Sequence, residues 1–139
     1  MQIEINNQTP SASLNFFLKK AAGACLKKLG IKQDLSLVLV GDKRIKELNK
    51  IYRRKNKVTD VLSFGDWDDK KFLGEVFICL PQAKRQAKKY GATLKRELTR
   101  LLAHGLLHLA GFDHEKTKQE EKEMLGKQEK IIKAIFTKY

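Results

Sequence analysis

The three histidines of the chain stand close together in its last third, as His104, His108 and His114. A spacing of four residues places the first two imidazoles on one face of a helix, one turn apart. Gly111 can adopt the left-handed backbone angles that end a helix, and this reversal would return His114 to the same point in space. Because imidazole is a good ligand for zinc and neighbouring transition metals, the pattern predicts a metal site.

The three histidines are one ligand short of the four that a structural zinc site usually has. Structural zinc usually has four Cys or His ligands, yet the chain has no further histidine and no cysteine near this stretch. The open position would hold water or substrate, which favours a catalytic role. One divalent ion, with zinc preferred, could act as a Lewis acid on a carbonyl or phosphoryl oxygen, or lower the pKa of bound water to roughly 7. Hydrolysis is the expected reaction class.

The histidine spacing also resembles the metal motif of the metzincin proteases, H-E-x-x-H-x-x-G-x-x-H. Those enzymes carry a glutamate directly after the first histidine as general base, whereas this chain has Gly105. Glycine has no side chain to accept a proton, so peptide hydrolysis by that mechanism is disfavoured. The formal net charge of +13 favours a polyanionic partner, nucleic acid first, so a phosphodiester substrate fits better.

Length and composition indicate the class of protein. With 139 residues, 42% of them apolar and 32% charged, the chain is expected to form one globular domain, residues 1–139. No apolar run is long enough to cross a membrane, and the N-terminus lacks the pattern of a signal peptide. Cys25 and Cys79 form no CxxC pair and are expected to be buried free thiols of a reducing cytoplasm.

The hydrophobic pattern predicts an α+β fold in which one mixed four-stranded β-sheet carries about five helices. Two strands, 61–64 and 73–80, are joined by a short polar connection and should pair antiparallel. Asp42, Thr93 and Thr117 are expected as helix N-caps. The helix that Thr93 opens has a spine of leucines, so it should be central and buried, with the metal site at its C-terminal end. Strands are expected at 2–6, 35–40, 61–64 and 73–80, and helices at 11–29, 42–52, 81–90, 93–110 and 117–135.

A run of cations, Arg53-Arg54-Lys55-Asn56-Lys57, precedes the third expected strand. Such a run is either a phosphate clamp or a solvated basic loop, and the pattern alone leaves both open. As a clamp, Arg53 could hold a phosphate beside the metal. Asp113 could orient a histidine as its hydrogen-bond partner, and Trp67 could pack or stack on a base. Three carboxylates are candidate proton acceptors: Glu75, Glu97 and Glu115.

Three blocks of the sequence resemble the YbeY family of bacterial endoribonucleases, also described as ribosomal RNA maturation factors. The blocks are LNKIYRRKNKVTDVLSF (48–64), LGEVFI (73–78) and HGLLHLAGFDH (104–114), the last followed by Met124 and Glu129. Two positions depart from the family pattern. Val58 stands where a proline is usual, and Glu75 stands where an aspartate is usual.

The resemblance implies a single α+β domain with a zinc-type ion held by His104, His108 and His114. It implies single-strand-specific cleavage of RNA, in 3′-end maturation of 16S ribosomal RNA and in ribosome quality control. Arg53 matches the functionally important arginine of the family's Tyr-Arg motif, so Arg53 and His114 are the candidate catalytic residues. The implied partners are ribosomal RNA and ribosomal proteins or assembly factors, with a monomeric chain, no membrane and no organic cofactor.

Two other functions stay open at this point. The chain could be a non-catalytic ribosome assembly factor that binds ribosomal RNA and protein, with the metal organising the loop around His114. It could also be a metal-dependent hydrolase of another substrate, such as a peptide, although Gly105 disfavours that reaction.

Overall fold

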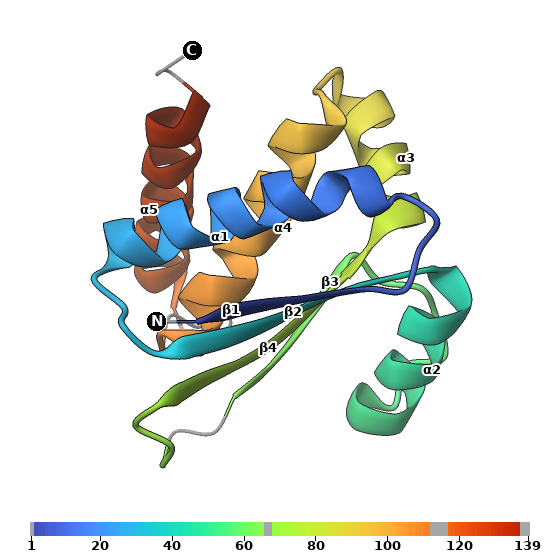
Figure 1. Ribbon diagram of the computed structural model, residues 1–139, viewed down its shortest axis with the longest axis horizontal. Helices are drawn as coiled ribbons and strands as arrows, with labels where there is room; N and C mark the ends of the chain where they lie inside the picture. The colour runs from blue at the N-terminus through green and yellow to red at the C-terminus, as the bar shows by residue number, and fades with distance from the viewer. Residues whose placement is uncertain (1, 66–67, 112–116, 137–139) are drawn as a thin grey trace.

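The expected α+β fold is confirmed by the computed structural model, which describes residues 2–65, 68–111 and 117–136. The elements follow one another in the predicted order (Figure 1). They are β1 (Ile3–Asn7), a 3-10 turn η1 (Ala12–Leu14), α1 (Asn15–Leu29), β2 (Asp34–Val40), α2 (Asp42–Arg53), β3 (Val61–Gly65), β4 (Phe72–Cys79), α3 (Leu80–Tyr90), α4 (Leu94–Leu109) and α5 (Lys118–Phe136).

The four strands of the described residues form one mixed sheet in the order β1-β2-β4-β3. Strand β2 pairs in parallel with both β1 and β4, while β3 pairs antiparallel with β4, as its short connection predicted. The two central strands are almost wholly buried because both of their faces are covered, which explains their continuous apolar sequence. Strand β3 stands at the end of this order and forms one edge of the sheet.

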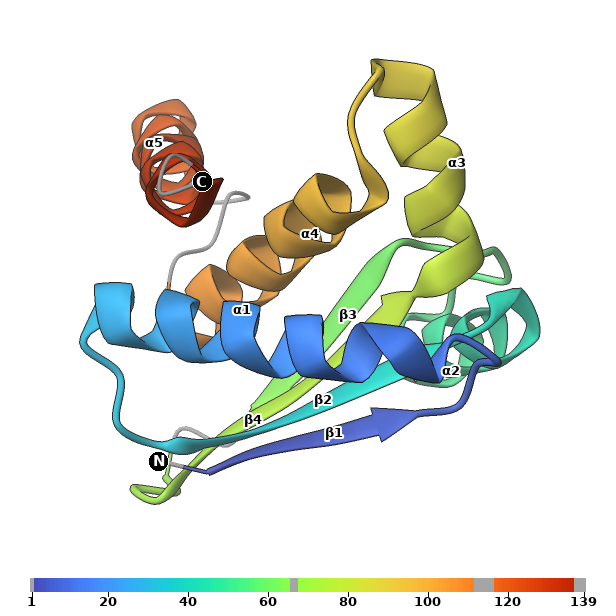
Figure 2. The ribbon, with the colours of Figure 1, turned by 45° about the horizontal axis from the view of Figure 1, so that its top comes forward.

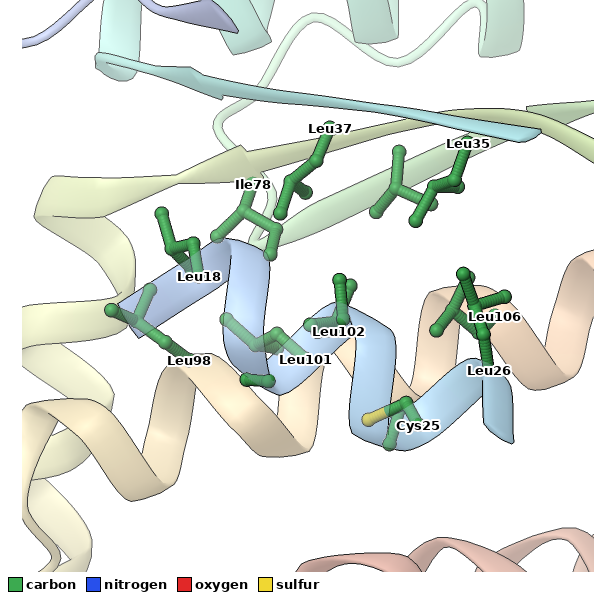
Figure 3. Close-up of a cluster of buried hydrophobic side chains, with 14 of the residues drawn as sticks. Leu18, Cys25, Leu26, Leu35, Leu37, Ile78, Leu98, Leu101, Leu102 and Leu106 are labelled. Atoms are coloured by element: carbon green, nitrogen blue, oxygen red, sulfur yellow. The ribbon is translucent and has the colours of Figure 1, made fainter. Parts of the chain in front are cut away.

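Helices cover the two faces of the sheet unequally. Helices α1 and α4 lie across one face, and α5 packs on them from outside (Figure 2). Their shared core is built mainly of leucines from α1, α4 and the inward positions of β2, together with Ile78 of β4 and the Cys25 thiol (Figure 3). Helix α2 covers the opposite face, where Ile45 and Leu48 pack on Phe77 of β4. None of the helices in the described ranges is both long and apolar enough to traverse a bilayer.

The helix ends follow the predicted chemistry with one exception. Thr93 caps α4, because its hydroxyl accepts a hydrogen bond from the Arg96 backbone N–H at 3.1 Å, and Thr117 accepts one from Glu120 at 3.0 Å. The prediction of Asp42 as an N-cap was wrong, since Gly41 occupies that position with an extended backbone. Asp42 lies in the first turn of α2 and forms a two-pronged ion pair with Arg85 of α3, at 2.7 and 3.1 Å.

The two cysteines are free and buried, as expected. Cys25 belongs to the core between α1 and α4, and burial raises the pKa of its thiol to about 12. Cys79 ends β4 on the α2 face, where its sulfur donates to Asp42 at 3.2 Å, and burial likewise raises its pKa to about 12. Neither thiol is poised to act as a nucleophile or a metal ligand, because both functions need the thiolate.

Candidate metal centre

His104 and His108 lie side by side on the last turns of α4, as their spacing predicted. Their ring centroids are 5.9 Å apart and the ring planes are nearly perpendicular, at 81°. Both side chains are partly exposed on an otherwise buried helix. His114 and Asp113 fall outside the described residues, and within those residues no group of three or more His, Cys, Asp or Glu side chains gathers. The pair therefore supplies two donors of the predicted set, on one face and one turn apart.

A buried glutamine of α5 holds the first histidine in place. The Nδ1 atom of His104 lies 3.1 Å from the Oε1 atom of Gln128, whose side chain is only 2% exposed. A proton on Nδ1 makes this contact a hydrogen bond, which fixes the orientation of the ring. Histidines that bind metals are typically fixed in this way by a partner on the other ring nitrogen. The donor set and its support therefore fit a divalent ion of the zinc type.

Sequence reasoning missed the role of Gln128. Gln128 lies on the buried face of α5 together with Met124, Ile131 and Ile132. From the sequence it looks like one more residue of the helix face that packs on the core. The available signal was its polarity, because an amide on such a face needs a hydrogen-bond partner from elsewhere in the fold. The partner is 24 residues away in sequence, so only the packing of α5 on α4 reveals it.

Gly105 lets α4 approach the sheet closely at the histidines. A Cβ atom at this position would lie 2.9 Å from the Ser63 Oγ atom of β3 and 3.0 Å from a methyl group of Val76 on β4. The Ser63 hydroxyl also donates to the Gly105 carbonyl at 3.3 Å. A glutamate has no room here, so the position of the metzincin base is closed by packing as well as by residue type. This packing supports the prediction against a metzincin mechanism.

Leu109 fixes the end of α4 against the same part of the sheet. A Cβ atom at Gly65 would lie 2.8 Å from one methyl group of Leu109, and one at Gly74 would lie 3.1 Å from the other. Helix α4 ends at Leu109, and the chain then turns through Gly111, whose φ of 103° lies in the region that favours glycine. The predicted helix break is confirmed, and α4 packs closely on the sheet at Gly105 and at Leu109, on either side of His108.

An open cleft of about 620 Å³ lies beside His108. Lys28 from the end of α1 and Lys127 from α5 both line it, together with Ser63 and Gln33. Both lysines are exposed. Two lysines in the lining of the same cleft as His108 bring positive charge that favours an anionic group.

Arg53 lies on the other side of the sheet from the histidines. It is the last residue of α2, which packs on the face opposite to α4 (Figure 1). Arg54 continues with left-handed backbone angles at φ 58°, and the buried Asn49 donates to the Lys57 carbonyl at 3.0 Å. The cationic run thus has a defined course and exposed side chains. The structure brings His104, His108 and Gln128 together, and it places Arg53 across the edge strand β3 from them.

The candidate proton acceptors are also separated from the histidines. Glu97 is buried in the first turn of α4, where Arg100 donates to it at 2.8 and 2.6 Å and Gln86 at 2.6 Å. It lies seven residues before His104, about 10 Å along the helix axis. Glu75 projects from β4 on the α2 face and accepts a hydrogen bond from Ser36 at 3.3 Å. Glu115 falls outside the described residues.

Comparison with known proteins agrees with this fold. A family model described as Endoribonuclease YbeY matches residues 2–136. Proteins of that name are 41% identical in a Sulfurihydrogenibium species (94% of this chain and 90% of that protein) and 40% identical in Persephonella marina (96% and 92%). The solution structure of a Thermotoga maritima protein is 31% identical, with a TM-score of 0.71, over 99% of this chain and 91% of that chain.

These matches show that the protein is a nuclease, which is a hydrolase that acts on RNA. The chain belongs to the YbeY endoribonuclease family, whose known role is the maturation of ribosomal RNA.

Proposed function

We propose that this chain is a metal-dependent, single-strand-specific endoribonuclease that processes the 3′ end of 16S ribosomal RNA and takes part in ribosome quality control. The observation that carries the proposal is the His104–His108 pair, in which Gln128 contacts His104 and His108 lines a cleft that two lysines also line. A histidine donor set beside fixed positive charge suits a phosphodiester, because the reaction builds negative charge on the phosphoryl oxygens.

The proposed metal ligands are His104, His108 and His114, and the proposed ion is zinc. When bound, such an ion supplies Lewis-acid chemistry at a phosphoryl oxygen. Gln128 keeps the His104 ring oriented through its contact with Nδ1. Lys28 and Lys127 draw the RNA backbone into the cleft.

Arg53 is proposed as a catalytic residue that binds a phosphate of the substrate. Its place at the end of α2 suits contact with the part of the RNA that passes around the edge strand β3. A guanidinium binds phosphate through two parallel N–H donors. Removal of Arg53 should therefore lower the rate of cleavage more than removal of a cation that makes no such hydrogen bonds. The nucleophile is either water or the ribose 2′-hydroxyl. The two differ in their products, since only attack by the 2′-hydroxyl leaves a cyclic phosphate.

The test is cleavage of a 16S ribosomal RNA precursor by protein of known metal content. Arg53→Ala should lower kcat/KM by about 10- to 100-fold, the worth of a charged hydrogen bond to phosphate. His114→Ala should lower both the metal content and the rate. Arg44→Ala is the matched control, because Arg44 is an exposed arginine at the start of α2 that pairs with Glu47. Equal cleavage by all four folded proteins would refute these roles and bring the assembly-factor function forward.

The remaining parts of the proposal concern partners and location. RNA is the substrate of the family, and the charge of +13 on this chain is matched to a polyanion. Ribosomal proteins or assembly factors are the proposed protein partners, the cytoplasm is the proposed location, and the chain is proposed to act as a monomer. Sedimentation of the protein with small-subunit precursors from gently lysed cells would test the ribosomal association.

A further inference from the structure

Tyr52 is an exposed aromatic residue that the metal centre does not use. Its side chain is 63% exposed, on the last turn of α2 and directly before Arg53. Its ring packs against Phe64 of β3, with centroids 5.0 Å apart and ring planes at 57°. Phe64 in turn meets the edge of Phe77 on β4 at 5.8 Å, and Phe77 is only 8% exposed. The three rings form a row from the interior to the surface, and the row supports Tyr52 from one side.

Cationic residues precede and follow Tyr52 in the chain. Lys50 and Arg53 belong to the same end of α2, and Arg54, Lys55 and Lys57 follow it, all of them exposed. The backbone of this segment is tied to α2, because Lys55 donates to the Asn49 carbonyl at 3.3 Å and Asn49 donates to the Lys57 carbonyl at 3.0 Å. The cross-strand partner of Phe64 on β4 is Glu75, which accepts a hydrogen bond from Ser36. An exposed aromatic face on a segment rich in exposed cations suits a planar group that carries phosphates on both sides.

We propose that Tyr52, supported by Phe64, is a stacking platform for one unpaired base of the RNA substrate, with flanking phosphates held by the cations of residues 50–57. The proposal rests on RNA as the substrate. Bases of a duplex are already stacked on their neighbours, so only a single strand can offer a free base face to Tyr52. The platform would therefore contribute to selection of single-stranded RNA, on the α2 side of the edge strand, while the histidines lie on the α4 side.

The experiment measures binding of a fluorescein-labelled single-stranded RNA by anisotropy, with the RNA checked for integrity afterwards. A second RNA of the same length carries abasic sites along its central stretch. Tyr52→Ala should weaken binding of the normal RNA by about 5- to 100-fold, the usual range for loss of one stacked base. It should leave binding of the abasic RNA unchanged. Tyr52→Phe keeps the ring and should bind within about twofold of wild type.

The matched control is Tyr90→Ala. Tyr90 is 66% exposed, ends helix α3 and has the Lys89 ammonium 5.6 Å from its ring centroid. It thus shares exposure, helix end and positive neighbours with Tyr52, but among the described residues no row of rings supports it. Its removal should change RNA binding by less than about twofold. Thermal denaturation of each variant confirms that it is folded.

The outcomes separate this platform from the nuclease function. Equal binding of normal RNA by wild type and Tyr52→Ala overturns the platform, as does an equal loss on normal and abasic RNA. If such a result comes with cleavage by wild type, the nuclease function stands without the platform. If wild type binds RNA in a Tyr52-dependent way but cleaves nothing in a parallel assay, the platform stands and the nuclease function falls.

Discussion

Replacement of Gln128 by methionine should weaken zinc binding without unfolding the protein. The side chains have similar length, so the change removes the acceptor for His104 and leaves the packing of α5 nearly intact. In the metal-free protein the contact is a neutral hydrogen bond of 3.1 Å, worth about 1 kcal/mol. With an ion on Nε2 the imidazole carries part of its positive charge, and a charge-assisted bond is worth about 1.5–3 kcal/mol.

The difference between these two states sets the expected change in affinity. It amounts to about 0.5–2 kcal/mol, which corresponds to an increase of about 2- to 30-fold in the zinc dissociation constant. Competition with a chromogenic chelator at fixed pH measures this constant directly and does not depend on RNA cleavage. Gln128→Glu keeps an acceptor at the same place and should hold the affinity or raise it, whereas a purely structural role of Gln128 predicts no such rescue.

The matched control is Gln119→Met, an exposed glutamine in the first turn of the same helix α5, which should leave the affinity unchanged. The folded state of each variant is checked by denaturant unfolding, where Gln128→Met should lose at most about 1 kcal/mol. If folded Gln128→Met binds zinc as tightly as wild type, then Gln128 does not orient a metal ligand. In that case the fit of the histidine pair to a metal would lose its main support.

Two further predictions concern stability and are measured by denaturant and thermal unfolding. Gly105→Ala should destabilise the fold by about 1–3 kcal/mol, because the new Cβ atom would lie 2.9 and 3.0 Å from side-chain atoms of β3 and β4. Gly126→Ala in α5 should instead stabilise the fold by about 0.5–1 kcal/mol, because the new Cβ atom would have open space around it. Equal effects of the two changes would contradict the close approach of α4 to the sheet. The Arg85 guanidinium lowers the pKa of Asp42, so this pair should stabilise the fold above the ordinary pKa of 3.8 and lose that contribution as the pH falls through the lowered value. Arg85→Gln should flatten this acid dependence by less than about 1 kcal/mol, since the pair is exposed, and an unchanged acid profile would show that the pair contributes nothing.

The sequence was sufficient for features that depend on the regular repeat of the backbone. Apolar residues at helical spacing, with Thr93 at the start and a glycine at the end, located α4. The same repeat placed His104 and His108 on one face. The short connection between β3 and β4 determined their antiparallel pairing. Each of these features is set by residues within one element or one turn, so it can be deduced before the fold is known.

Contacts between distant segments were decided by the tertiary structure. The pairing of Gln128 with His104, the exclusion of a side chain at Gly105 and the separation of Arg53 from the histidines all depend on which element packs on which face of the sheet. The change of Asp42 from an expected cap to a partner of Arg85 has the same origin. A pattern within one segment shows which face of a helix is apolar, but the polar partner across an interface is fixed only when the helices and the sheet pack together.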